Sequence, residues 1–256
     1  MKKDTSWGRV AEWYNELFDD KNTYQKAVIL PNLLRVMDIK KGDVVLDLAC
    51  GQGFFSREFN KKGAKVIGVD ISKELIDIAI KNSPKGIEYH VSSADRIEFI
   101  ADQSVDKAAI ILATQNIDNF KDALRECNRV LRPEGRLFIV LNHPAFRTPK
   151  ESSWGWDPSA NSGQGAQYRR VDRYLSELKA PIQMHPGENP KEITLSFHRP
   201  LQSYFKAFRK NNFVVAGLEE WVSNRKSEPG PRAAAENRAR SEIPLFMFLE
   251  LRKIKL

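Results

Sequence analysis

The chain has 256 residues, of which 41% are hydrophobic, and this is enough for one large domain with a full core. No apolar run approaches the ~20 residues that cross a bilayer, and the first residues lack the unbroken apolar stretch of a signal peptide. We therefore expect a cytoplasmic protein without a membrane partner. The net charge of +8 would suit an anionic partner, but basic and acidic residues interleave along the chain, which favours a solvated surface.

Cysteine and histidine contents argue against a metal site. Cys50 and Cys127 form neither a disulfide framework nor a metal-binding spacing. The histidines are scattered along the chain, without the i, i+4 pairing of a helical metal site. We expect no metal.

Helical patterning dominates the start of the chain, at 7–18 and 23–37, and predicts an N-terminal helical cap over residues 1–40. Strands and helices then alternate. Ser72 is placed as the N-cap of a helix over 72–83. The apolar runs that predict strands are 43–49, 64–71, 87–95, 105–114, 136–142, 213–221 and 245–254. The helices between them are predicted at 54–63, 72–83, 120–135 and 199–212.

Strands that are continuously apolar and separated by helices indicate a parallel sheet with helices on both faces. The fold class is therefore α/β, doubly wound, and ligands should bind beyond the carboxyl ends of the strands. The alternation breaks at residues 143–198, which are rich in Pro, Gly, Ser and aromatic residues. We expect this segment to be an irregular insertion that serves as a lid over the substrate.

The first strand runs into a glycine turn, Gly51-Gln52-Gly53. A dinucleotide fingerprint would continue to a third small residue that is usually Gly or Ala, and here that position is Ser56. Asp70 ends the second strand, where a carboxylate accepts hydrogen bonds from ribose hydroxyls. Up to this point the pattern fits both NAD and S-adenosylmethionine.

Asp47 separates the two cofactors. It lies inside the first strand, four residues before Gly51. A buried carboxylate is costly without partners, and it would repel a pyrophosphate. A ligand that carries an ammonium and a sulfonium would favour it, so Asp47 favours S-adenosylmethionine.

Four segments together resemble the class I S-adenosylmethionine-dependent methyltransferases of the broad type 11 family: "VLDLACGQG", "GVDIS", "SSAD" and "RVLRPEGRLFIV". The resemblance implies a single methyltransferase domain over 1–256. It also implies a Rossmann-like sheet of seven strands, mostly parallel, with an antiparallel last strand between the fifth and sixth. The cofactor would be S-adenosyl-L-methionine, and the product S-adenosyl-L-homocysteine.

The resemblance also implies which residues contact the cofactor. Gly51 and Gly53 would face the methionine moiety, Asp70 would hold the ribose, and Ile71 would pack on adenine. Tyr14 and Tyr24 match positions that reach over the cofactor in relatives, with helix packing as the alternative reading. The full implied set is Tyr14, Tyr24, Asp47, Ala49, Gly51, Gln52, Gly53, Asp70, Ile71, Ala94, Asp95, Ala113 and Thr114.

The methyl acceptor requires a general base only if it must lose a proton. His143, at the end of the fifth strand, is the first candidate, because imidazole titrates near neutrality. His198, before a predicted helix, is the second. Trp154, Trp156 and Tyr168 would line an aromatic lid or else fasten the insertion to the sheet. The basic run at 168–174 would meet an anionic substrate group or else be solvated.

We expect a small-molecule acceptor, and three alternatives remain. A nucleic-acid methyltransferase, acting on ribose or base, is suggested by the basic balance. However, the fourth strand ends in "LATQNI", without an Asn/Asp-Pro-Pro-aromatic loop, and no Cys ends the fourth or fifth strand. A non-catalytic cofactor binder is the second alternative. An NAD-linked oxidoreductase comes last, because Ser56 and Asp47 both count against it.

Overall fold

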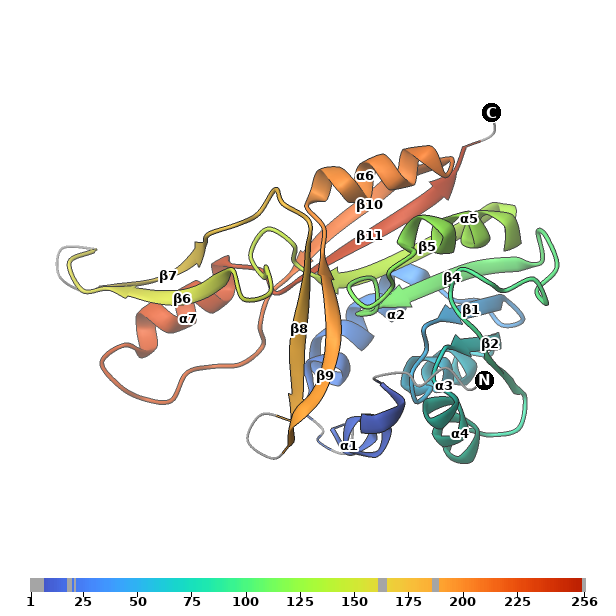
Figure 1. The fold of residues 1–256 in the computed structure, drawn as a ribbon, viewed down its shortest axis with the longest axis horizontal. Coiled ribbons are helices and arrows are strands. Elements are labelled where there is room, and N and C mark those ends of the chain that lie inside the picture. Colours follow the sequence, from blue (N-terminus) through green and yellow to red (C-terminus); the bar gives the residue numbers. More distant parts are fainter. Residues whose placement is uncertain (1–6, 18–19, 21, 161–164, 186–188, 255–256) are drawn as a thin grey trace.

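The protein is described here by a computed structural model, which covers residues 7–17, 20, 22–160, 165–185 and 189–254 (Figure 1). Its centre is a seven-stranded sheet built from β1 (Val44–Leu48), β2 (Lys65–Asp70), β3 (Ile87–Val91), β4 (Val105–Ile111), β5 (Leu131–Asn142), β10 (Phe213–Trp221) and β11 (Phe246–Lys253). The helices that pack around it are α1 (Ala11–Glu16), η2 (Gln25–Ile29), α2 (Leu30–Met37), α3 (Phe54–Lys61), α4 (Lys73–Asn82), α5 (Phe120–Val130), α6 (Leu201–Lys210) and α7 (Ala233–Glu242).

The strand order is β10-β11-β5-β4-β1-β2-β3. Strands β1 to β5 pair in parallel, and β11 pairs antiparallel with both β5 and β10. The predicted doubly wound, Rossmann-like sheet is confirmed, including the antiparallel last strand between the fifth and sixth. The order reverses between β1 and β4, and such a reversal opens a ligand crevice at the carboxyl ends of the two strands.

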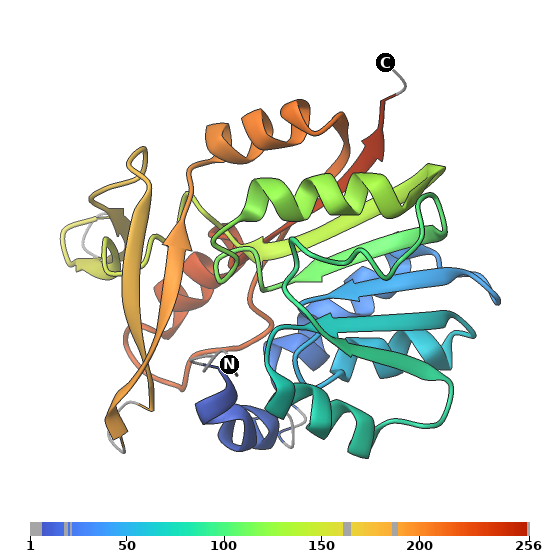
Figure 2. The ribbon, with the colours of Figure 1, turned by 45° about the vertical axis from the view of Figure 1, so that its right-hand side comes forward.

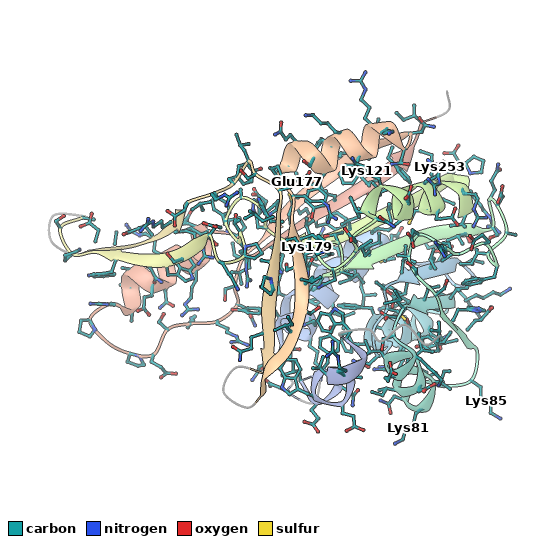
Figure 3. The ribbon with its side chains drawn as sticks, in the orientation of Figure 1. Lys81, Lys85, Lys121, Glu177, Lys179 and Lys253 are labelled. Carbon is teal, nitrogen blue, oxygen red and sulfur yellow. The ribbon has the colours of Figure 1, made fainter. Side chains whose placement is uncertain are left out.

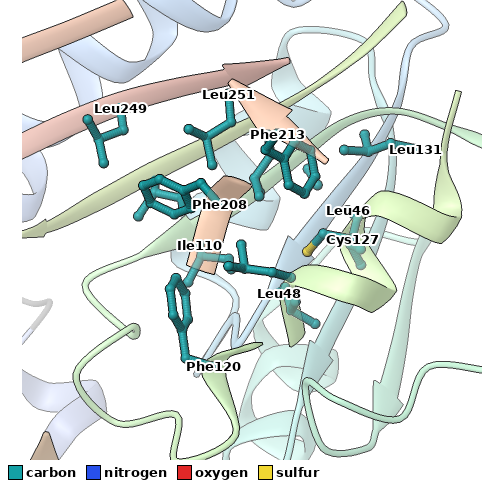
Figure 4. Packing of buried hydrophobic residues seen from close by; sticks show 14 of the residues in the cluster. Leu46, Leu48, Ile110, Phe120, Cys127, Leu131, Phe208, Phe213, Leu249 and Leu251 are labelled. Carbon is teal, nitrogen blue, oxygen red and sulfur yellow. The ribbon is translucent and has the colours of Figure 1, made fainter. Parts of the chain in front are cut away.

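Alternate residues of β1 enter two separate cores. Leu46 and Leu48 pack with α5 and α6, and Figure 4 shows them beside Phe120, Cys127 and Phe208. On the other face, Val45 packs with residues of α2 and α3. Figure 2 shows α5 and α6 on one side of the sheet and α2 and α3 on the other. Burial on both faces holds the strand rigidly, so the residues that follow it have fixed positions.

The described residues between 7 and 37 hold short helices. The apolar side of α2 lies on the sheet through Leu33 and Met37, both fully buried. Helix α1 packs against α4, beyond the carboxyl edge of the strands. The expected N-cap of α4 is confirmed, since the Leu75 N–H donates to the Ser72 hydroxyl at 3.2 Å. Within the described chain, every helix is too short or too polar to cross a membrane.

The expectation of an irregular insertion is wrong. Residues 143–198 hold two antiparallel hairpins, β6 (Ser152–Asp157) with β7 (Ala166–Val171) and β8 (Leu178–His185) with β9 (Asn189–His198). Both lie beyond the carboxyl edge of the sheet, and β7 packs against α7 (Figure 1). In the β6–β7 hairpin, the Tyr168 ring packs over Gly155. An added Cβ at Gly155 would lie 2.3 Å from this ring, so the packing requires glycine.

Candidate functional site

A cavity of about 380 Å³ lies at the carboxyl edge, where the strand order reverses between β1 and β4. Residues that follow β1, β2, β3 and β4 form its walls, and Trp7 and Tyr14 of the N-terminal cap close it. We call it the main cavity. The predicted residues that line it are Tyr14, Ala49, Gly51, Asp70, Ile71, Ala94, Asp95 and Ala113.

Asp70 connects the glycine turn to the start of α4. One carboxylate oxygen accepts the Gly51 N–H at 2.9 Å, and the other accepts the Ser72 N–H at 2.9 Å. Burial raises the pKa of Asp70, while these N–H groups lower it. A carboxylate oxygen accepts more than one hydrogen bond. Asp70 can therefore hold the turn and still accept hydroxyl groups from a ligand in the cavity.

Ile71, beside Asp70, supplies an apolar wall. The residue is 40% exposed and lines the main cavity. Across the cavity, Asp95 accepts hydrogen bonds from Ser93 and from the Asn119 amide, the latter at 2.8 Å. This end of the cavity can hold a flat ring between apolar and polar groups.

A smaller cavity of about 40 Å³ adjoins the first and shares Tyr14, Ala49 and Gly51 with it. Asp47 and Gln52 lie in its wall, and both are 2% exposed. Burial raises the pKa of Asp47 to about 7; the Ser56 hydroxyl, which donates to Asp47 at 2.6 Å, lowers it, and the nearby Asp70 raises it. The Gln52 Nε2 is buried without a hydrogen-bond partner among the described residues.

This pairing of a buried acid with an unsatisfied amide donor defines the chemistry of the small cavity. A cationic group would stabilise the Asp47 carboxylate, and a carboxylate would satisfy the Gln52 amide. A ligand with both groups, an amino acid moiety, fits the donor set. Tyr14 closes the cavity above them, and burial together with the charges of Asp70 and Asp47 raises its pKa to about 12.

Three of the predicted cofactor-binding residues line neither cavity: Tyr24, described below, and Gly53 and Thr114. Gly53 has a φ of +79°, and an added Cβ would lie 2.4 Å from the Tyr89 hydroxyl, so glycine here permits close packing of α3 on β3. Thr114 is fully buried, and its hydroxyl accepts from Tyr204 at 3.5 Å. Gly53 and Thr114 each lie one or two positions beyond a residue that does line a cavity.

Ala49 and Leu112 share an uncommon backbone conformation. They follow the adjacent strands β1 and β4, line both cavities, and have φ values of +61° and +52°. The left-handed region is disfavoured for residues with a Cβ, and such strain concentrates at functional sites. The turns that follow β1 and β4 therefore bring a strained backbone to the walls of both cavities.

Arg199, which the sequence did not single out, contacts the loop after β4. Its guanidinium donates to the carbonyls of Thr114, Ile117 and Asp118 at 2.8–2.9 Å. Ile117 and Asp118 line the main cavity. Arg199 therefore holds the loop after β4 in place. The adjacent His198 was the residue that the sequence singled out.

The two histidines proposed as bases lie away from both cavities. His143 is 3% exposed; its Nε2 lies 2.7 Å from the Glu220 carboxylate and its Nδ1 accepts the Ala145 N–H at 3.3 Å. Burial lowers its pKa, although Glu220 raises it. The Nε2 of His198 donates to the Tyr174 carbonyl at 2.7 Å. In this arrangement both nitrogens of His143 are occupied.

Tyr24 lies in a third cavity, of about 210 Å³, with Phe146, Arg147 and Trp154. Its hydroxyl lies 3.0 Å from the Ser223 hydroxyl, and its ring packs edge-on against Phe246. The next residue, Gln25, lines the small cavity. Among the described side chains, no group of three or more His, Cys, Asp or Glu residues is placed to hold a metal ion.

Residues 46–139 match the family model described as a methyltransferase domain. The chain is 35% identical over 109 residues to a demethylmenaquinone methyltransferase of Paenarthrobacter aurescens, covering 42% of each chain. It is 32% identical over 169 residues to a malonyl-[acyl-carrier protein] O-methyltransferase of Hamiltonella defensa, covering 63% of this chain and 64% of the relative.

A solved S-adenosylmethionine-dependent methyltransferase of Mesorhizobium loti has the same fold, with a TM-score of 0.69 and 23% identity, over 90% of this chain and 100% of that one. The chain spans about half the length of the curated relatives that it matches. The match is concentrated in the strands and turns that build the main cavity.

Proposed function

Since the chain belongs, through residues 46–139, to the class I S-adenosylmethionine-dependent methyltransferases, we propose that it transfers a methyl group from S-adenosylmethionine to a small-molecule acceptor. One observation carries the proposal: a main cavity with Asp70 and Ile71 at its wall adjoins a small cavity with Asp47 and an unsatisfied Gln52 amide. A nucleoside joined to an amino acid fits this pair of cavities.

Each end of the cofactor would find suitable groups. Asp70 would accept the ribose hydroxyls, and Ile71 would cover one face of the adenine. Asp95, at the opposite wall, would lie near the adenine amine. In the small cavity, Asp47 would offset the ammonium charge and Gln52 would donate to the carboxylate. Tyr14 would cover the junction, where the sulfonium belongs.

When bound, the cofactor would supply an activated methyl group on sulfur, and its transfer to a lone pair of the acceptor would leave S-adenosylhomocysteine. The contribution of the chain is alignment in a site closed to water. The left-handed turns at Ala49 and Leu112 and the loop held by Arg199 fix the walls for this purpose. Catalytic roles for His143 and His198 stay predictions, and we place neither in the mechanism.

A small acceptor is supported by the relatives, whose names specify a demethylmenaquinone and a malonyl-[acyl-carrier protein]. We keep the proposal that residues 143–198 cover the acceptor, because both hairpins lie beyond the carboxyl edge where the cavities open (Figure 2). Location in the cytoplasm stays a prediction.

A nucleic-acid acceptor is the second candidate, because basic side chains line a groove between α5, α6 and the β8–β9 hairpin: Lys121, Arg125, Lys179, Arg199, Lys206 and Lys210. Figure 3 labels Lys121 and Lys179, which both line this groove. Glu177, labelled beside them, and the acidic Asp118 and Asp122 line the same groove and reduce its positive charge. The small-molecule proposal is therefore preferred.

Calorimetric titration tests the cofactor proposal. We expect micromolar binding of S-adenosylmethionine and S-adenosylhomocysteine, and no heat with NAD. Asp70→Ala should weaken S-adenosylhomocysteine binding at least tenfold while the circular dichroism spectrum is retained. Asp77→Ala, an exposed carboxylate on α4, is the matched control and should bind as the wild type does. Failure of the wild type to bind either methionine-derived ligand would overturn the proposal.

A further inference from the structure

The third cavity, which we call the arginine cavity, lies between the β6–β7 hairpin, α7 and the start of β11. Its walls carry three guanidinium groups, from Arg147 after β5, Arg169 on β7 and Arg240 on α7. Three separate segments of the chain thus direct arginines to one cavity of about 210 Å³.

Among the described residues, these arginines have no acidic partner. Arg169 donates to the Phe146 carbonyl and the Ser152 hydroxyl, each at 2.7 Å, and Arg240 donates to the Ser227 hydroxyl at 3.2 Å. Within the part of the chain that the structure describes, no Asp or Glu carboxylate lies within ion-pair distance of Arg147, Arg169 or Arg240. By contrast, the neighbouring Arg170 forms an ion pair with Asp172 at 2.6 Å.

The positive charges of Arg147 and Arg169 repel one another. Arg147 is exposed and Arg169 is partly buried, and burial together with the charge of Arg147 lowers the pKa of Arg169. Like charges placed together in a partly enclosed site cost free energy that a bound anion would recover. Arginine is also the side chain best suited to grip a carboxylate or phosphate through two parallel hydrogen bonds.

Tyr24, Phe146 and Trp154 add aromatic rings to the wall. The Arg169 guanidinium lies 5.2 Å from the centre of the Trp154 ring, and Arg225 lies 4.5 Å from that of Tyr24. Ile243 and Leu245 add apolar surface. A ligand with a planar apolar body and an anionic group would satisfy both kinds of surface.

The arginine cavity neighbours the cofactor site along the chain. Tyr24 lines it, and the following residue, Gln25, lines the small cavity beside Asp47 and Gly51. We propose that the arginine cavity binds the carboxylate or phosphate group of an aromatic methyl acceptor. This rests on the proposed function, because it takes the junction of the main and small cavities as the place where the methyl group is presented.

The test uses small probes and the full chain. Calorimetry should show that wild type binds benzoate or phenyl phosphate at least tenfold more tightly than neutral benzamide. Benzoate alone would identify a carboxylate ligand, and phenyl phosphate alone a phosphate ligand. Arg147→Gln and Arg240→Gln should each weaken the preferred anion at least fivefold. Arg238→Gln is the matched control, because it removes the same charge from α7 at an exposed position outside the cavity.

S-Adenosylhomocysteine titrations of the same proteins separate the two proposals. If wild type and both variants bind S-adenosylhomocysteine equally and only the anion affinity falls, the arginine cavity holds the anion. If S-adenosylhomocysteine binds but both anions bind no better than benzamide, the arginine inference is wrong and the proposed function stands. Anion binding that Arg147→Gln and Arg240→Gln leave unchanged would also overturn the inference. Loss of S-adenosylhomocysteine binding in the wild type would instead remove the proposed function.

Discussion

Asp47 shows how one residue connects the stability of the fold to its site. Its carboxyl is buried, and burial raises its pKa to about 7, well above the value near 3.9 of an unfolded chain. The folded protein therefore keeps this proton to higher pH than the unfolded chain does. Stability from this group is fully present below about pH 4 and is lost as the pH rises to about 7.

Asp47→Asn should remove this dependence, because an amide keeps an oxygen for the Ser56 hydroxyl and does not ionise. Relative to wild type, the free energy of unfolding of the variant should rise between pH 5 and pH 8 by on the order of 3 kcal/mol. Urea unfolding at both pH values measures it. Asp77→Asn, on the exposed face of α4, should show no such change; an Asp47→Asn difference that is flat with pH would contradict the assignment.

Single residues at strand ends were the most predictable part of the site. Asp70, Ile71 and Ala113 follow from knowing where an apolar run stops, because parallel strands end at a common edge. Gly53 and Thr114 were placed in the site for the same reason and line neither cavity. A shift of one or two positions turns a side chain from the cavity into the core, and the sequence does not resolve such a shift.

At the scale of elements, the β8–β9 hairpin and the loop after β4 form one unit. The Phe197 N–H donates to the Gln115 carbonyl at 2.7 Å, and Arg199 adds three bonds to the same loop. The hairpin therefore holds one wall of the main cavity in place. This long-range dependence has no sequence signature, because Arg199 reaches residues more than 80 positions earlier.

Arg199→Lys tests this coupling, because an ammonium cannot reach all three carbonyls in the planar arrangement of a guanidinium. We expect S-adenosylhomocysteine affinity to fall about fivefold to twentyfold, and amide hydrogen exchange to increase in residues 114–119. The exchange of α4 should stay unchanged. Arg209→Lys, on α6, is the control. Faster exchange throughout the sheet would mean that Arg199 serves global stability instead.

The hairpins of the insertion were missed as elements, although a signal was present. Trp154 and Trp156 alternate with Ser153 and Gly155, which is the two-residue period of a strand. Proline, glycine and serine around them are typical of loops, and they outweighed the alternation. The segment forms strand β6 because it pairs antiparallel with β7, which follows a connection that begins after Asp157.

On the scale of the whole molecule, the order of the sheet followed from the sequence because the strands are buried on both faces and read as apolar runs. The cavities could not be predicted from the sequence in the same way. The main cavity depends on the position of the N-terminal cap over the strand ends. The arginine cavity depends on contacts between the segments that carry Arg147, Arg169 and Arg240. Contacts between distant segments are set by packing, which a local pattern does not encode.

Ligand binding should stabilise the whole fold. S-Adenosylhomocysteine at one hundred times its Kd adds about 2.7 kcal/mol to the free energy of unfolding. For a chain of this size, that corresponds to a rise in Tm of about 5–10 °C. Differential scanning fluorimetry measures it, with NAD at the same concentration as the control and Asp70→Ala as the variant that should lose the shift. A matching rise with NAD would contradict the cofactor proposal.

The left-handed backbone at Ala49 and Leu112 bears on how this protein could be engineered. Each such residue costs about 1–2 kcal/mol, in a fold whose net stability is of the order of 5–15 kcal/mol. Glycine at position 49 would relieve that cost, yet it would also loosen the turn that both cavities share. A glycine at position 49 would therefore raise thermostability and lower activity, so stabilising substitutions should be placed in the sheet and its helices.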